Sequence, residues 1–126
     1  MDKLSHEQLN RYQYTIGLSE IKEEGQLKLL NSSVLLVGAG GLGSAALLAL
    51  ACLGIGHIGI VDNDVISETN LPRQIIYGMS DVGKGKAITA KKVLKNKNPD
   101  IDVKVFPCRL DEKNARRIIK KYDIVL

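Results

Sequence analysis

A glycine-rich turn between two apolar segments limits most strongly what this chain can fold into. Residues 38–43 read Gly-Ala-Gly-Gly-Leu-Gly and follow Val-Leu-Leu-Val at 34–37. A short β-branched and apolar run that stops at glycine is typical of a strand buried on both faces of a parallel sheet. The segment 44–53 is rich in Ala and Leu and apolar all round, which predicts a buried helix ending at Gly54. The sequence therefore predicts a strand, a tight turn and a helix in succession.

The same alternation of strand and helix signals continues along the chain. Further strands are expected at 58–61, 103–106 and 124–126, and helices at 5–12, 21–30, 84–95 and 112–121. This order predicts an α/β fold: a Rossmann-like, mainly parallel sheet with flanking helices, preceded by short N-terminal helices. We expect a helical segment over 1–31 and a βαβ core over 32–126. Because the last strand has only begun at Leu126, we expect a truncated domain, the N-terminal part of a longer one.

Composition excludes several classes of protein. The 126 residues are 44% hydrophobic and 25% charged, as in a globular protein rather than a disordered one. Cys52 and Cys108 lie too far apart for a zinc-binding pair, and the apolar run 42–53 is too short for the ~20 residues that span a bilayer. Without an apolar segment at the N-terminus, a cytoplasmic protein without a membrane partner is expected. The net charge of +4 could favour an anionic ligand but does not indicate nucleic-acid binding.

The glycine turn has the spacing of a dinucleotide-binding fingerprint. Glycines 38, 40 and 43 satisfy G-x-G-x-x-G directly after a strand and before a helix, and Asp62 lies 19 residues after Gly43. Glycine lets the backbone approach a phosphate, the helix N-terminus attracts the anion, and the acid can bind ribose hydroxyls. A glycine turn without a ligand is the alternative interpretation. The fingerprint serves both NAD and ATP enzymes, so the next segment has to separate them.

A polar, irregular segment follows the second strand, over 63–79. It carries Asp64, Asn70, Arg73 and Gln74, and Lys86 lies in the first turn of the next helix. An enzyme that handles a triphosphate needs cations at the phosphates, and the guanidinium fork and the ammonium group supply them. A lysine at a helix N-terminus is disfavoured unless an anion neutralises it. The alternative is that both cations are ordinary surface groups.

Together these segments make the sequence similar to the ThiF/MoeB/HesA family, relatives of the ubiquitin-activating enzymes. The resemblance covers essentially the whole chain, in the family's order and spacing. The matching residues are Arg11-Tyr12, Gly38-Ala39-Gly40-Gly41-Leu42-Gly43, Asp62-Asn63-Asp64, Asn70-Leu71-Pro72-Arg73-Gln74, and Gly83-Lys84 with Lys86. The combination of G-x-G-G-L-G, D-x-D and N-L-x-R-Q is more specific than any one of them.

The resemblance implies an activity. These enzymes use ATP and Mg²⁺ to adenylate the C-terminal glycine carboxylate of a small ubiquitin-like protein, and they act as dimers with shared sites. In sulfur-carrier branches the adenylate becomes a thiocarboxylate for thiamin or molybdopterin synthesis. By position, the resemblance implies catalytic roles for Arg73, Lys86 and Arg11. It implies nucleotide binding by Gly38, Gly40, Gly41, Gly43, Asp62 (the ribose), Asp64, Asn70, Arg73, Gln74 and Lys86, with Asp64 and Gln74 in supporting roles.

The sequence departs from the family in two respects. Members usually carry a second arginine three residues after the one that matches Arg11, and it reaches the partner subunit's triphosphate; here Tyr14 stands in its place. Tyrosine carries no charge, so Arg11 or another cation substitutes or adenylation is poor. The family's Mg²⁺-binding aspartate, zinc-binding cysteines and carrier-binding half would follow residue 126. We therefore expect no metal site here and no activity from these residues alone.

Three other functions fit part of the pattern. An NAD-dependent oxidoreductase would explain the glycine turn and Asp62, but not the segment 70–74 or Lys86. A non-catalytic nucleotide-binding module of the same family would explain Tyr14. The related tRNA-modifying dehydratases adenylate a nucleoside carboxylate, and the N-L-P-R-Q wording and the lack of a strong basic patch argue against that branch.

Overall fold

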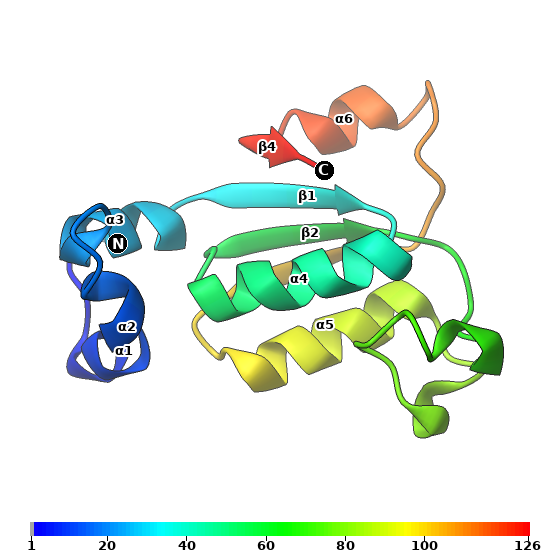
Figure 1. Cartoon of the computed structure of the whole chain (residues 1–126). Helices are drawn as coiled ribbons and strands as arrows, with labels where there is room; N and C mark the ends of the chain where they lie inside the picture. The colour runs from blue at the N-terminus through cyan, green and yellow to red at the C-terminus, as the bar shows by residue number, and fades with distance from the viewer. Residues whose placement is uncertain (1) are drawn as a thin grey trace.

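Four short strands form a parallel sheet, and helices cover both of its faces (Figure 1). The computed structural model describes residues 2–126. The strands are β1 (Ser33–Val37), β2 (His57–Val61), β3 (Asp102–Phe106) and β4 (Ile124–Val125). The α-helices are α1 (His6–Arg11), α2 (Gln13–Ile16), α3 (Lys22–Leu30), α4 (Gly41–Leu53), α5 (Lys86–Lys97) and α6 (Ala115–Ile119), and the 3-10 turns are η1 (Glu68–Asn70) and η2 (Met79–Asp81).

The strand order is β3-β2-β1-β4, and every pair is parallel. In the register, Leu36 lies beside Ile60 of β2, and Ile60 lies beside Val105 of β3. Because all strands point the same way, their carboxyl ends meet at one edge of the sheet, where the chain enters α4 and the long segment after β2 (Figure 1). The expected Rossmann-like parallel sheet is confirmed.

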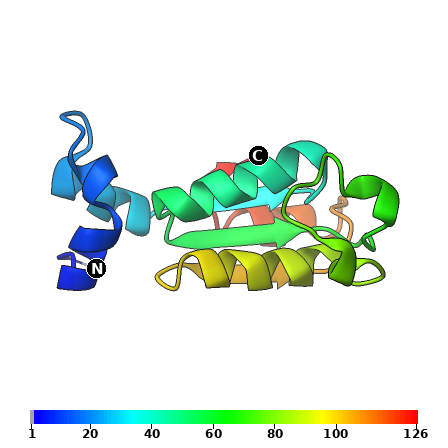
Figure 2. The same cartoon turned by 60° about the horizontal axis from the view of Figure 1, so that its bottom comes forward.

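Alternate side chains of the strands build two separate cores. Even-numbered positions of β1 and β2, such as Leu36 and Ile60, pack with α4 and α5 in a large cluster that also takes in Ile66 and Tyr77. The odd positions face the other way, where Leu35 packs with Ile118 of α6 in a smaller cluster. This alternation follows from the two-residue repeat of a strand. Figure 2 shows α4 and α5 side by side along the sheet.

The N-terminal helices form a third cluster beside the amino ends of the strands (Figure 1). Ser5 caps α1 with a reciprocal pair of hydrogen bonds to Gln8, as its position before the helix predicts. The expected helix over 5–12 is present as α1, which has Ser5 as N-cap and Tyr12 as C-cap, and α2 follows it as a separate short helix that was not predicted. Tyr12 is buried to 2% exposure and anchors this cluster to the rest of the chain.

Two helices differ from the sequence prediction. Helix α4 begins at Gly41, inside the glycine turn, rather than at Ser44. The prediction of a buried helix over 44–53 is right for only one side of α4, because Leu47 and Ala51 are buried whereas Ala49 and Cys52 are exposed. Helix α6 is shorter than 112–121, since the Asp111 carboxylate accepts hydrogen bonds from the amides of Lys113 and Asn114 and holds those residues in a turn.

Within residues 2–126, none of the helices is both long and apolar enough to span a membrane.

Candidate functional site

The glycine turn places the start of α4 at the carboxyl end of β1. Gly38 has φ of +102°, a conformation that favours glycine, and its amide donates to the Val61 carbonyl oxygen at 2.8 Å. A Cβ atom on Gly43 would overlap the Gly38 carbonyl oxygen, so only glycine lets the helix pack this closely on the turn. Gly40 caps the helix without any side-chain hydrogen bond. The first amides of α4 are therefore oriented to bind an anion.

Asp62, immediately after β2, fastens the glycine turn to its neighbouring strand. One carboxylate oxygen accepts a hydrogen bond from the Ala39 amide at 2.8 Å, and the other accepts one from the Asp64 amide at 2.8 Å. Each oxygen has a second lone pair, so a ribose hydroxyl can still donate to this carboxylate. The structure thus brings Asp62, the residue predicted to bind the ribose, into direct contact with the predicted phosphate-binding turn.

Tyr77 also holds the glycine turn, although no motif in the sequence indicates this role. Its hydroxyl donates to the Ala39 carbonyl oxygen at 2.8 Å, and the Lys86 carbonyl oxygen lies 3.3 Å away. Burial, and then the nearby carboxylates of Asp62 and Asp81, raise the pKa of Tyr77 far above its ordinary value. The hydroxyl therefore stays protonated and keeps donating to the turn.

Arg73 and Gln74 lie over the first glycines of the turn. The Arg73 guanidinium is 3.6 Å from the position that a Cβ of Gly41 would occupy, and the Gln74 amide nitrogen is 3.7 Å from that of Gly40. Among residues 2–126, no carboxylate forms an ion pair with Arg73. Gln74 is 2% exposed, and its buried amide oxygen has no hydrogen-bond partner.

A buried serine holds the segment that carries these two residues. Ser44 lies in the first turns of α4, and its hydroxyl accepts a hydrogen bond from the Ile76 amide at 3.0 Å. This contact joins the long segment after β2 to the helix that the glycine turn begins. No motif indicates a role for Ser44. The only signal in the sequence is a polar residue within an otherwise apolar helix, and the structure buries that residue.

Lys86 is the first residue of α5, and its side chain is buried. Its ammonium nitrogen is 4.0 Å from a carboxylate oxygen of Asp64, whose side chain is 71% exposed. A buried charge needs a partner, and one distant, solvated carboxylate is weak compensation. A cavity of about 130 Å³ lies here, with Asp62, Asp64 and Lys86 in its wall.

Asn70 joins this cluster through its backbone, because its carbonyl oxygen accepts hydrogen bonds from the amides of Arg73 at 3.2 Å and Gln74 at 2.9 Å. Among residues 2–126, no contact joins Arg11 to the cluster. The Asn70 side-chain oxygen accepts from the amide and the hydroxyl of Ser67 and so closes the η1 turn. Arg11 lies among the N-terminal helices, at the opposite end of the sheet from the glycine turn, and pairs with Asp100 at 2.7 Å (Figure 1). Tyr14, which stands in place of the family's second arginine, is 86% exposed.

The described residues do not form a metal centre. Among residues 2–126, no three His, Cys, Asp or Glu side chains come together as a metal site would require. Asp62 is occupied by two backbone amides, and Asp64 faces Lys86. Residues 2–126 therefore supply no three-ligand site for Mg²⁺ on their own.

An apolar cavity of about 410 Å³ opens beside the turn. Gly38, Gly43 and Leu126 line it together with other apolar residues of β1 and α4. The site therefore combines free helix-terminal amides, a carboxylate, two cations and an adjoining apolar wall. This set suits a ligand with a polyphosphate, a sugar and an apolar part.

Comparisons with known proteins identify the family of this chain. Residues 12–126 match the ThiF family, and the chain belongs to that family. It is 52% identical over 122 residues to a probable molybdopterin-synthase adenylyltransferase of Porphyra purpurea, which covers 97% of this chain and 32% of that protein. It is 42% identical to the sulfur carrier protein adenylyltransferase of Thermus thermophilus, covering 95% of this chain and 44% of that one. The chain thus spans less than half the length of either relative.

Solved structures show the same fold. The E. coli tRNA N6-threonylcarbamoyladenosine dehydratase in complex with AMP superposes with a TM-score of 0.89 at 31% identity, covering 96% of this chain and 49% of that one. An E. coli MccB structure with ATP has a TM-score of 0.71 at 36% identity, covering 74% of this chain and 28% of that one.

Proposed function

We propose that this chain is the nucleotide-binding portion of an enzyme that uses ATP to adenylate the C-terminal carboxylate of a ubiquitin-like sulfur-carrier protein. The observation that carries the proposal is the hydrogen bond between Asp62 and the Ala39 amide, which joins a ribose ligand to a phosphate-binding turn. A ribose needs only the Asp62 carboxylate, whereas a triphosphate also needs positive charge. Arg73 and Lys86 at the same edge of the sheet supply that charge.

The chemistry asks for positioning and charge neutralisation. A carboxylate oxygen of the carrier attacks the α-phosphorus in line and forms the new O–P bond, while the bond from that phosphorus to the β-phosphate oxygen breaks. Pyrophosphate leaves with the electron pair of the broken bond. The amides at the start of α4 hold phosphate oxygens, and Arg73 and Lys86 neutralise the charge that passes to the pyrophosphate. Asp62 holds the ribose, so the reacting phosphate is fixed relative to the turn.

Arg11 enters this proposal only through a second copy of the chain. Because Arg11 lies at the other end of the sheet from its own glycine turn, it can meet a triphosphate only in a partner's site. We therefore propose that the intact protein is a homodimer, with no nucleic acid or membrane partner, and that it acts in the cytoplasm. The thiamin and molybdopterin pathways are both open for the carrier.

Nucleotide binding by the purified protein tests the proposal. Titration calorimetry should show ATP binding more tightly than NAD, and Arg73→Gln should weaken ATP binding about ten- to hundredfold, as the loss of a hydrogen bond to a charged group does. Lys92→Gln is the matched control, because Lys92 is an exposed cation on the outer side of α5. Preferential binding of NAD, or an unchanged ATP affinity in Arg73→Gln, would reject the proposal.

A second candidate is adenylation of a carboxylate on a tRNA nucleoside. The structural similarity to the dehydratase favours it, at 31% identity. The relatives named for carrier proteins are more similar in sequence, at up to 52% identity, and this supports the carrier as substrate. ATP–pyrophosphate exchange with the intact enzyme separates the two, because exchange would depend on a ubiquitin-like carrier in one case and on modified tRNA in the other. Exchange with neither would favour a non-catalytic nucleotide-binding module.

A further inference from the structure

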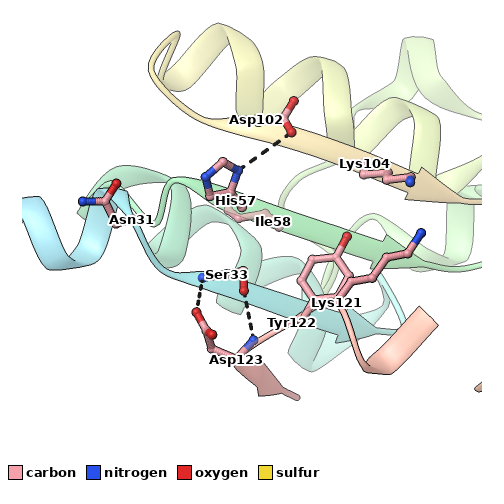
Figure 3. A pocket seen from close by; sticks show the side chains of 9 residues that line it. All are labelled: Asn31, Ser33, His57, Ile58, Asp102, Lys104, Lys121, Tyr122 and Asp123. Carbon is pink, nitrogen blue, oxygen red and sulfur yellow. Dashed lines mark hydrogen bonds and ion pairs between the residues drawn. The ribbon is translucent and has the colours of Figure 1, made fainter. Parts of the chain in front are cut away.

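A second cavity lies far from the glycine turn, at the amino ends of the strands and on the face that α6 covers. It measures about 360 Å³ and is open to solvent. Ser33, His57 and Asp102 begin the three long strands and contribute to its wall, and Tyr122 and Lys121 close it from the segment before β4 (Figure 3). This cavity shares no residue with the nucleotide site.

Two lysines, Lys104 and Lys121, line one end of this cavity. Lys104 lies across the sheet face from Lys121 (Figure 3), and the nearness of Lys104, then of Arg117 and Lys120, lowers the pKa of Lys121. The ammonium nitrogen of Lys104 is 5.4 Å from the centre of the Phe106 ring. Within the described part of the chain, no carboxylate forms an ion pair with Lys104 or Lys121. The positive charge at this end is therefore uncompensated.

The two acids of the cavity are held at its other end. Asp123 accepts a hydrogen bond from the Ser33 amide at 2.9 Å, and its own amide donates to the Ser33 hydroxyl at 2.9 Å. Asp102 lies 3.9 Å from the ring nitrogen of His57, its neighbour on β2 (Figure 3). Asp123 is thus tied to Ser33 and Asp102 faces a histidine, whereas the two lysines have no carboxylate partner among the described residues.

Tyr122, next in the chain to Lys121, adds a hydrogen-bond donor to the cavity wall. Its ring stands edge-on to Phe106, with centroids 6.3 Å apart, and its hydroxyl lies so close over Gly59 that no Cβ would fit there. Burial and the Asp102 carboxylate raise the pKa of Tyr122, so the hydroxyl keeps its proton. A bare glycine at the centre of β2 thus makes room for a fixed phenol on the cavity floor.

We propose that this cavity binds a small, multiply charged phosphate-type anion between the Lys104 and Lys121 ammonium groups, with the Tyr122 hydroxyl as a third donor. Lysine is a point charge suited to phosphate, and two lysines that lack carboxylate partners gain most from a shared anion. The volume matches a small ligand, since pockets for small molecules run from about 300 Å³ upward. The site is separate from the proposed nucleotide site and does not depend on it.

Titration of the purified, ¹⁵N-labelled protein with inorganic pyrophosphate tests the proposal by NMR. The amide signals of Gly59 and Tyr122 should shift and saturate, and sodium chloride at the same ionic strength should not reproduce the shift. Substituting both lysines, Lys104→Gln with Lys121→Gln, should weaken the affinity at least about tenfold, since two charge-assisted contacts are lost.

Two further variants separate this site from other cations. The pair Lys92→Gln with Lys97→Gln removes the same charge from α5 and should leave the affinity unchanged. Arg73→Gln should also leave the pyrophosphate-induced shifts of the Gly59 and Tyr122 amide signals unchanged, whether or not the proposed nucleotide site exists. The proposal is overturned if chloride produces the same shifts, if the lysine substitutions do not weaken binding, or if Arg73→Gln abolishes the shifts at Gly59 and Tyr122.

Discussion

The two ends of the parallel sheet are each organised around a buried tyrosine hydroxyl, but the polar groups around the two hydroxyls differ in how completely they are hydrogen-bonded. At the amino end, the Tyr12 hydroxyl donates to Asp100 at 2.8 Å and accepts from the Asn98 side chain at 2.8 Å. Asn98 also donates to the Ala51 carbonyl oxygen, and Arg11 pairs with Asp100. This network joins the N-terminal helices to α4 and to the turn before β3, and its members satisfy one another.

At the carboxyl end, the polar groups remain partly unsatisfied. Tyr77 and Asp62 hold the glycine turn, yet Arg73 has no acidic partner in the described residues and the Gln74 amide oxygen has no hydrogen bond. An unpaired amide oxygen alone does not mark a site, because Gln26 has one too, at the amino end. The difference lies in the combination: an unpaired cation, Arg73, beside free helix-terminal amides indicates binding, whereas a completed network indicates structure.

The largest expected effect breaks the carboxyl end at Gly43. Replacing Gly43 with Ala places a Cβ on the Gly38 carbonyl oxygen, so α4 must move off the turn. The free energy of unfolding, measured by urea denaturation, should fall by about 3 kcal/mol or more, and ATP binding should be lost. Gly41→Ala is the control, since its Cβ would meet only ordinary contact with Arg73. Equal stability of the two variants would contradict the close packing described here.

The amino end is broken most directly at Asn98. Asn98→Ala removes two donors and leaves the Ala51 carbonyl and the Tyr12 hydroxyl without them. We expect a loss of about 2–3 kcal/mol of unfolding free energy in urea denaturation, with ATP affinity unchanged, because this network is structural. The exposed neighbour Asn96→Ala should lose less than about 0.5 kcal/mol. A marked fall in ATP affinity in folded Asn98→Ala would show that the two ends are coupled.

Alkaline pH tests the amino-end network through Tyr12. Burial, and to a lesser extent the hydrogen bond and charge of Asp100, raise the pKa of Tyr12 from 10.0 to about 12. The folded protein holds the protonated phenol, so this contribution is complete below pH 10 and is lost as the pH rises through 12. It is worth at most about 2–3 kcal/mol. The free energy of unfolding, measured by urea denaturation at each pH in this range, should fall less steeply with rising pH in Tyr12→Phe than in the parent protein.

The other tyrosines provide the comparison for this experiment. Tyr77 and Tyr122 also have raised pKa values and keep some pH dependence in the variant. Tyr14→Phe is the matched control, because Tyr14 is 86% exposed and should leave the slope unchanged. If Tyr12→Phe and Tyr14→Phe gave the same slope, the Tyr12 hydroxyl would not be held as described.

The smallest effect on stability is expected at Arg11. Its ion pair with Asp100 is partly exposed, so Arg11→Gln should lower the unfolding free energy by no more than about 1 kcal/mol in urea denaturation. If Arg11 acts in a partner's site, the same substitution should slow ATP–pyrophosphate exchange by the intact enzyme without weakening ATP binding to its own subunit. Unchanged exchange would leave Arg11 as a structural residue of the amino end.

The fold was largely predictable because its signals are local. The apolar run at 34–37, the glycine turn and the helix after it were each visible in a few consecutive residues, and the parallel sheet followed from their order. The extent of α4 burial was not predictable, because an all-apolar helix such as the one carrying Leu42 gives no sign of which side lies against the sheet. The short α6 depends on where the Asp111 side chain turns, which propensity does not decide.

The candidate site was predictable where a motif stood behind it. Asp62, Arg73, Gln74 and Lys86 all lie at the carboxyl edge of the sheet, as their positions after the strands suggested, although their roles stay predictions. Tyr77 and Ser44 were missed because each acts on backbone atoms of residues more than thirty positions away. Such contacts exist only after the chain has folded, and no spacing rule expresses them.

The double attachment of Asp62 has a consequence for how any ligand is recognised here. The carboxylate that would bind the sugar also accepts hydrogen bonds from the Ala39 and Asp64 amides. The geometry of the glycine turn and the choice of ligand therefore depend on a single side chain. A substitution of Asp62 cannot separate these two effects, because losing the contact to the sugar also removes the hydrogen bonds that hold the glycine turn.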